Sequence, residues 1–387
     1  ASAISVPALT NFSYTGTSNL SFDNSSATAS TINWGATAGT EANAINLNVT
    51  AFAGTLTITS GSYIKNLNFT GSTATCASTI LSFGNLTLAS GGTYTGLVTT
   101  FSATSGTQLI TLNGKSVGAT TQSGSGGTVS LQDAFNCVSY SITAGTLITN
   151  NNNISLSGTG TVWSCTAGTL TLGTSKISLT NTSTTARTFA GGGQTYPNLE
   201  IGGTTGTSTL TTTGANTFTT LSSTKTVAHT ITFPTTGTTT ITNWTITGSS
   251  GNLVTVTSAT SGTQANIAVT NKTSGIDYLS VRDINCTNLT PVTFYVGANS
   301  TNTSNNFGVA FLSPTANNIH VLTSGTSFTV PGDFNASNNT IYLIGAGGGG
   351  GTGAVSGNNR AAGGGGGGGG YTAISNFSPS GSTVTYA

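Results

Sequence analysis

The sequence predicts an all-β protein: an irregular right-handed parallel β-helix, or solenoid, followed by a small glycine-rich β domain. Three observations predict it. Apolar residues alternate with Thr, Ser and Asn in short runs, which is the two-residue period of a half-buried strand. Clusters of Gly, Ser, Thr and Asn separate these runs and turn the chain. Helical spacing of apolar residues is not sustained anywhere, and the helix formers Glu, Lys, Arg and Met are scarce or absent.

Residues 169–201 show this pattern in one place. Leu170 and Leu172 alternate with Thr and Gly, and Ile177 and Leu179 alternate with Lys, Ser and Thr. Polar residues at 181–185 and three glycines at 191–193 then turn the chain before the alternation resumes at 198–201. The same pattern recurs at 55–59, 66–70, 238–247 and 254–257. We therefore expect a stack of short half-buried strands joined by corners.

A parallel solenoid fits these strands better than a sandwich or a closed barrel. A sandwich would contain many two-residue Asn-Gly turns, but Asn113-Gly114 is the only such pair. A barrel would need longer strands of similar length. With about 20 to 25 residues per rung and about 4.8 Å between strands, the solenoid would have about ten to twelve rungs and measure about 50 Å. The crossover preference of parallel strands predicts a right-handed coil.

The low charge of the chain excludes several classes of partner. Only 4% of the residues are Asp, Glu, Lys or Arg, against about 25% in typical soluble proteins. The net charge is +1 and the basic residues are scattered singly, so there is no patch for nucleic acid and no polybasic membrane anchor. No window approaches the roughly 18 apolar residues of a spanning helix. We expect neither nucleic-acid binding nor membrane insertion.

Metal and cofactor sites are not predicted either. The four cysteines are far apart and form no CxxC pair, so a zinc site is not expected. Free buried thiols are favoured, with two disulfides as the alternative in an extracellular protein. The glycine run at 345–353 lacks the Gly-Lys-Ser/Thr sequence of a phosphate-binding loop. We expect no cofactor. The cysteines are Cys76, Cys137, Cys165 and Cys286.

Catalytic residues are not predicted. The chain has seven acids, and the pair Asp277 and Asp283 would stand about 20 Å apart along an extended strand, too far for glycosidase geometry. Stacking of rungs could still bring Asp283 near another acid, although a local ion pair with Arg282 at the end of the solenoid is favoured. His229 and His320 have no recognisable nucleophile partner. A non-enzymatic protein is expected, with a polysaccharide depolymerase as an alternative.

Rows of alternating threonine, such as residues 238–242, are also typical of ice-binding solenoids. Threonine is, however, the ordinary outward residue of a strand in a chain with few charges. An ice-binding face also needs regular rungs, whereas the repeat length here is irregular. These threonines are therefore expected to be structural.

Several stretches resemble the repetitive β-helical proteins of phage tail fibres and of large bacterial surface proteins. They lie at 105–111, 127–134, 160–163, 187–193 and 196–199. Residues 277–283, 294–300 and 305–308 resemble the final rung of such proteins. The resemblance covers about residues 50–311. It implies a structural rod, and for phage proteins a trimer.

The C-terminal part resembles the glycine-rich domain at the ends of phage fibres and their adhesins. The strand at 340–346 leads into glycine runs at 347–351 and 363–370, and this similarity covers about residues 319–387. In that family, loops between glycine runs meet the host surface. The resemblance and the amide, guanidinium and phenol groups present imply a receptor site at Ser356, Asn358, Asn359, Arg360 and Tyr371.

Three parts are therefore expected: an N-terminal β segment at 1–49, the β-helix at 50–311 and the glycine-rich domain at 312–387. The expected function is that of a virion structural protein of the tail-fibre or spike type. It would contact other virion proteins and attach to a glycan or receptor on the host surface. The alternative is a bacterial surface adhesin or extracellular filament subunit, which would be located outside the cell or on its surface.

Overall fold

The computed structural model describes most of the N-terminal four-fifths of the chain and short segments of the rest. The described residues are 2–5, 19–22, 29–33, 41–58, 62–272, 275–287, 294–311, 322, 325–330, 339–345, 347–349, 355–356, 359–360, 368–381 and 383–385. The chain divides into two compact units, Ala1–Pro314 and Thr315–Ala387. The sequence-based boundary lies close by, between residues 311 and 312.

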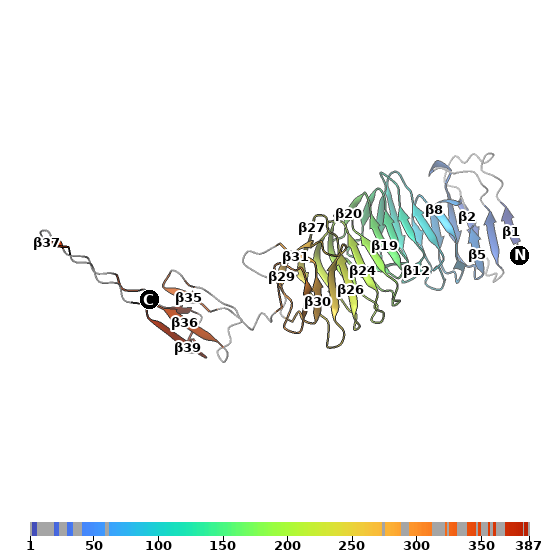
Figure 1. Ribbon diagram of the computed structural model, residues 1–387. Helices are drawn as coiled ribbons and strands as arrows, with labels where there is room; N and C mark the ends of the chain where they lie inside the picture. Colours follow the sequence, from blue (N-terminus) through green and yellow to red (C-terminus); the bar gives the residue numbers. More distant parts are fainter. Residues whose placement is uncertain are drawn as a thin grey trace. The chain divides into compact units, whose positions relative to one another are not determined.

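The first unit is a parallel β-solenoid of about 11 turns (Figure 1). Every pairing between its named strands is parallel, because each strand pairs with the equivalent strand of the next turn, as Thr120 pairs with Tyr140. Among the described residues the only helix is a single 3-10 turn, η2 (Glu41–Asn43). The all-β fold and the parallel solenoid are thus confirmed, and the hand of the coil stays a prediction.

A 19-stranded sheet forms the largest part of the solenoid. Its principal ladder consists of β2 (Asn19–Phe22), β4 (Ile45–Val49), β6 (Ser62–Phe69), β8 (Thr79–Ser82), β10 (Val98–Phe101), β13 (Thr120–Gln122), β16 (Tyr140–Ile142), β19 (Gly160–Cys165), β22 (Arg187–Ala190), β24 (Thr209–Thr213), β26 (His229–Phe233), β28 (Val254–Ser258), β30 (Leu279–Arg282) and β33 (Thr301–Ser304). A shorter ladder joins it through β6 and contains β9 (Leu86–Thr87), β11 (Thr107–Thr111), β14 (Thr128–Leu131), β17 (Thr146–Ile148) and β20 (Thr169–Thr171).

Two further sheets complete the turns. A nine-stranded sheet contains β12 (Ser116–Val117), β15 (Phe135–Cys137), β18 (Ile154–Leu156), β21 (Lys176–Leu179), β23 (Thr195–Ile201), β25 (Thr217–Ser223), β27 (Thr238–Trp244), β29 (Ala265–Lys272) and β31 (Ile284–Cys286). A four-stranded sheet near the N-terminus contains β1 (Ser2–Ser5), β3 (Ser30–Asn33), β5 (Thr55–Ile58) and β7 (Thr75–Cys76). The small pair β32 (Phe294–Tyr295) and β34 (Val309–Ala310) follows the last turn.

The cross-section of the solenoid changes near residue 187. Turns between β13 and β21 contain three short strands, whereas turns from β22 onward contain two longer ones. Alternate side chains of both kinds of strand point inward, as the buried and half-buried positions of β26 show. The predicted alternation therefore marks most of the core in both halves; in β11 (Thr107–Thr111), however, Leu109 is 42% exposed and Gln108 is buried.

Stacked aromatic side chains fill the centre of the core. Trp163 lies between Tyr140 and Phe189, with ring centroids 5.7 and 5.8 Å away. Its indole Nε1 donates a hydrogen bond of 3.1 Å to the hydroxyl of Tyr196, which donates to the Gly191 carbonyl at 2.7 Å. Each of these buried polar atoms has a hydrogen-bond partner. Burying them in the apolar core therefore leaves no unsatisfied polar group at this position.

The cysteines are free and buried, as the sequence predicts. Burial raises the pKa of the Cys76 thiol to about 11 and also raises that of Cys137. Thiols with raised pKa values are poor nucleophiles and poor metal ligands at neutral pH. We assign them to core packing.

The second unit contains three antiparallel strand pairs among its described residues. They are β35 (Ser327–Thr329) with β40 (Thr383–Thr385), β36 (Thr340–Ile344) with β39 (Tyr371–Ser375), and β37 (Val355–Ser356) with β38 (Asn359–Arg360). The switch from parallel to antiparallel pairing separates this unit from the solenoid in architecture. No helix of the described chain is both long and apolar enough to cross a membrane.

Candidate functional site

The predicted receptor residues lie on two strand pairs of the second unit. Ser356 pairs with Asn359, and Arg360 pairs with Val355. The side chains of Ser356, Asn359 and Arg360, and the whole of Asn358, lie outside what the structure describes. The prediction for these four residues therefore stays a prediction.

Tyr371 is described, and it lies at the start of β39. It is opposite Ile344 in the strand pair, and Tyr342 is opposite Ala373. Because directly opposite residues and residues two apart share one side of a strand pair, all four lie on the same side. A backbone hydrogen bond of 2.7 Å from Gly345 N to Gly370 O continues this pairing toward the glycine runs.

We call Tyr342, Ile344 and Tyr371 the tyrosine face. Their exposed fractions are 63%, 81% and 67%, and the two tyrosine rings are 6.1 Å apart with an angle of 25° between their planes. Large side chains exposed to this degree on a short strand pair form an apolar patch, and such patches commonly mark interaction sites. Of the five predicted receptor residues, Tyr371 lies on this patch, and its described neighbours there, Tyr342 and Ile344, were not among those expected.

Side-chain and backbone hydrogen bonds hold the base of this strand pair. The Asn339 amide donates to the Phe377 carbonyl and accepts from the Phe377 N–H, both at 2.9 Å. The Asn376 N–H donates to the Asn339 carbonyl at 2.7 Å, and Asn376 has a positive φ of 54°, which Asn tolerates better than most residues. These contacts hold the C-terminal end of β39, whereas Tyr371 of the tyrosine face lies at its N-terminal end.

The chemistry of the tyrosine face is aromatic and nearly free of charge. Asp333 and Arg360 are the only charged residues after residue 314. Exposed phenol rings offer apolar surface for a sugar ring or an apolar side chain, together with one hydroxyl each for hydrogen bonding. Tyr342 was missed in the sequence because the strand at 340–346 was considered only as the element that leads into the glycine runs. Its two-residue spacing from Ile344 was the available signal.

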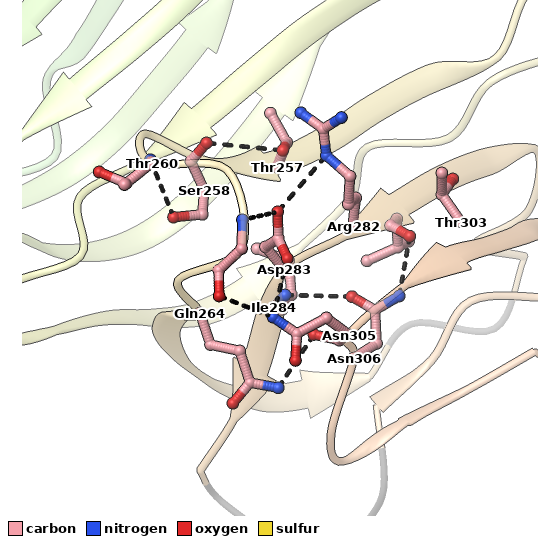
Figure 2. Close-up of polar contacts among 12 residues, drawn as sticks. Thr257, Ser258, Thr260, Gln264, Arg282, Asp283, Ile284, Thr303, Asn305 and Asn306 are labelled. Carbon is pink, nitrogen blue, oxygen red and sulfur yellow. Dashed lines mark hydrogen bonds and ion pairs between the residues drawn. The ribbon is translucent and has the colours of Figure 1, made fainter.

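The end of the solenoid holds the acid that the sequence raised as a catalytic candidate. Asp283 lies between β30 and β31, is 2% exposed and has a positive φ of 55°. Its carboxylate accepts hydrogen bonds from the Asn305 amide at 2.8 Å and the Gly262 N–H at 3.0 Å, and it pairs with Arg282 Nε at 3.5 Å (Figure 2). The Asn305 amide first, then the Gly262 N–H, holds the pKa of Asp283 below its usual value. The predicted local ion pair with Arg282 is confirmed.

Asp277 has a similar structural role in the same turn. Its carboxylate accepts from the backbone N–H groups of Tyr278 and Asn299, at 2.8 and 2.9 Å, and from the Asn299 amide at 2.7 Å. Both acids therefore connect the last turns of the solenoid to each other. Figure 2 shows how the polar side chains around Asp283 converge on that connection.

The other described acids also bind groups of other turns, one turn away for Asp133 and Glu200 and 63 residues away for Glu41. Glu41 accepts from the Thr104 hydroxyl at 2.8 Å, Asp133 accepts from the Leu112 N–H at 2.9 Å, and Glu200 pairs with Lys176 at 2.8 Å. No group of three or more His, Cys, Asp or Glu side chains in the described residues could hold a metal ion. The acids of the described part thus connect strands and corners.

A cationic group lies in the interior near β22 and β26. The guanidinium of Arg187, which is fully buried, donates to the Leu179 carbonyl at 2.9 Å and to the Ser208 hydroxyl at 2.7 Å. The ammonium of Lys225 donates to the carbonyls of Gly203 and Gly206, both at 2.9 Å. These donors hold corner loops of successive turns together.

His229 lies close to both cations. Its ring nitrogens contact the Ser223 hydroxyl at 3.0 Å and the Val227 carbonyl at 2.9 Å. Burial lowers the pKa of His229, and the nearby charges of Lys225 and Arg187 lower it further, although the Val227 carbonyl acts in the opposite direction. Burial and the charge of Arg187 lower the pKa of Lys225 to about 8. Sequence reasoning missed this group because Arg187 lies 38 residues before Lys225 and joins Lys225 and His229 only through the stacking of turns.

No known protein family, curated protein or solved structure matches this chain. The resemblance to phage and bacterial surface proteins therefore rests on the sequence motifs and the solenoid fold.

Proposed function

We propose that the chain is a non-enzymatic structural protein of the tail-fibre or spike type, carried on a virion, that attaches to a glycan or other receptor on the host surface. The tyrosine face is the observation that carries the proposal. A solenoid of stacked turns can serve as a structural rod, and the C-terminal unit offers an exposed aromatic surface suited to recognition. A trimer is the proposed assembly.

The hydrogen bonding of the acids supports a non-enzymatic role. A glycosidase needs a carboxylic acid and a carboxylate free to reach the same sugar bond. Asp277 and Asp283 each accept several hydrogen bonds from the chain itself. Such saturated carboxylates are better suited to fixing turns than to exchanging protons with a substrate.

A binding measurement tests the proposal. The purified full chain is applied to an array of bacterial surface polysaccharides, together with the double variant Tyr342→Ala/Tyr371→Ala. Truncation of an aromatic hot spot costs about 2 kcal/mol or more, so the double variant should bind at least about tenfold more weakly than the wild type. Thr329→Ala, an exposed position on β35 of the same unit, serves as the matched control and should bind like the wild type.

Three outcomes contradict parts of this proposal. Undiminished binding by the folded tyrosine variant would remove the tyrosine face from recognition. Release of reducing ends or unsaturated sugars from a polysaccharide would establish the depolymerase instead. Immunolabelling of bacterial cell surfaces, with none on virions, would favour the bacterial adhesin or filament subunit.

A further inference from the structure

Two buried hydrogen-bond donors near the start of β22 have no acceptor among the described residues. Arg187 is 0% exposed, and its Nε–H makes no hydrogen bond there. Ser208 is also buried, and its hydroxyl accepts from Arg187 Nη2 at 2.7 Å, but no described group accepts the proton of that hydroxyl. Buried donors are nearly always paired with protein, water or an ion. These two donors therefore call for an acceptor from outside the described chain.

The two donors lie side by side. Nε and Nη2 of an arginine share one edge of the planar guanidinium, and Nη2 is the nitrogen that contacts Ser208. One small acceptor can thus receive both the Nε–H and the Ser208 hydroxyl proton. Nη1, in contrast, donates to the carbonyls of Leu179 and Asn181, at 2.9 and 3.4 Å. The Nε edge is the part of the guanidinium left for a further ligand.

The surroundings of the two donors are positively charged. An arginine in a protein keeps its charge, and the Lys225 ammonium reaches back to the Gly203 and Gly206 carbonyls of the corner that precedes Ser208. Burial and then the charge of Arg187 lower the pKa of Lys225 to about 8, so Lys225 is still mostly protonated at neutral pH. Neither cation forms an ion pair with a described acid.

His229 borders this region without being a ligand in its neutral form. Thr209 pairs with Thr230, which places the preceding residues, Ser208 and His229, in neighbouring turns of the same ladder. A carbonyl can only accept a hydrogen bond, so His229 Nδ1 donates to the Val227 carbonyl and Nε2 accepts from a hydroxyl, that of Ser223. Both ring nitrogens are then occupied, and the two cations alone set the charge of the region.

We propose that Arg187 Nε and the Ser208 hydroxyl bind a small monovalent inorganic anion, such as chloride, close to the ammonium of Lys225. The ion accepts from both donors and partly neutralises two buried cations, whose burial without a counter-ion is costly. A sulfate or phosphate fits less well. Its several oxygens need more donors than these two, and the carbonyls of Leu179 and Gly206 around the cations repel its higher charge.

The proposed ion lies where corners of successive turns meet. Arg187 follows the corner at 180–186, Ser208 ends the corner at 202–208, and Lys225 belongs to the corner at 224–228. Here the turns change from three short strands to two longer ones. A bound anion therefore stabilises the stacking of these turns. A water molecule would satisfy the two donors but would leave the cations without a counter-ion, and the two alternatives differ in their dependence on salt.

Thermal unfolding of the full chain at constant ionic strength tests the proposal. Sodium chloride replaces sodium gluconate in steps at neutral pH, with gluconate as the bulky reference anion. The unfolding midpoint should rise with the chloride concentration and then level off, because a ligand that binds only the folded state stabilises it until the site is saturated. Bromide should act like chloride. A midpoint that does not depend on chloride would overturn the proposal and favour water.

Two variants remove the donors separately. Arg187→Gln removes the guanidinium, and its midpoint should not respond to chloride. Ser208→Ala removes only the hydroxyl and should need about tenfold more chloride, or higher, for half of the effect, because a hydrogen bond to a charged group is lost. Lys65→Gln removes an exposed cation elsewhere on the solenoid and should respond like the wild type. If Arg187→Gln does not fold, Ser208→Ala decides.

Bromide also locates the ion directly. In a crystal of the full chain soaked in bromide, anomalous scattering should place an ion in contact with Arg187 Nε and Ser208 Oγ. An unchanged chloride response in the folded donor variants would overturn the proposed site. A bromide peak there without any chloride effect on the midpoint would indicate an adventitious ion only and would also overturn it.

Discussion

At the residue scale, the few ionisable side chains of this protein are used to hold turns together. Each described acid accepts hydrogen bonds or an ion pair from its own chain, and Arg187 and Lys225 donate to the chain's own carbonyls. A chain with 4% charged residues can do this with little mutual repulsion. Repulsion is expected at one place. Near His229 the structure describes two cations, Lys225 and Arg187, and no acid.

The pH dependence of stability tests whether burial and these two cations act on His229. Burial and the two cations lower the pKa of folded His229 below its usual value, so the unfolded chain binds the proton more readily. The contribution of His229 is therefore complete above about pH 6.5 and is lost as the pH falls toward its folded pKa. Burial and the charge of Arg187 lower the pKa of Lys225 to about 8, so Lys225 contributes little to this window.

We expect the denaturant midpoint of the wild type to fall between about pH 7.5 and pH 5.5. In His229→Gln this fall should be smaller, because the titrating group has been removed. His320 is the only other histidine, and His320→Gln should retain the fall seen in the wild type. An equal fall in His229→Gln and the wild type would show that His229 does not set the pH dependence.

At the scale of elements, glycines allow corners of successive turns to approach closely. Gly192 has a φ of 65°, and a Cβ there would lie 2.0 Å from the Cys165 carbonyl oxygen. Gly160 has nearly the same φ of 67°, but a Cβ there would meet no atom within 4 Å. The two glycines share a left-handed backbone conformation, but only Gly192 lacks space for a side chain.

Alanine substitutions at these positions separate the two effects. Gly160→Ala should cost about 1–2 kcal/mol through the left-handed conformation alone. Gly192→Ala should cost about 1–3 kcal/mol more, because backbone must shift to relieve the contact. Urea unfolding measures both free energies. Equal losses would mean that the corner adjusts freely and that close approach does not require glycine.

The sequence predicts the strands better than their assembly into turns. The alternation around Leu170 and Ile177 identifies inward residues directly, because the period of a strand is local. The change from three to two strands per turn near Arg187 depends on contacts between turns and has no local signal. The same reason hides the tyrosine face, since Tyr342 and Tyr371 meet only through strand pairing.

At the scale of the whole molecule, the two units have different tasks in the proposed function. We propose that the solenoid unit, Ala1–Pro314, is the structural rod and that the unit Thr315–Ala387 carries recognition. Neighbouring turns supply most contacts of a solenoid, so removal of a separate C-terminal unit should leave the remaining turns folded.

The most direct measurement of this division compares polysaccharide binding by the full chain and by a chain that ends at Pro314. Circular dichroism and the unfolding midpoint establish that the shorter chain keeps its solenoid. The proposed function predicts that the full chain binds its polysaccharide and that the shorter, folded chain does not. Binding of equal strength by both chains would place recognition on the solenoid and contradict the central claim.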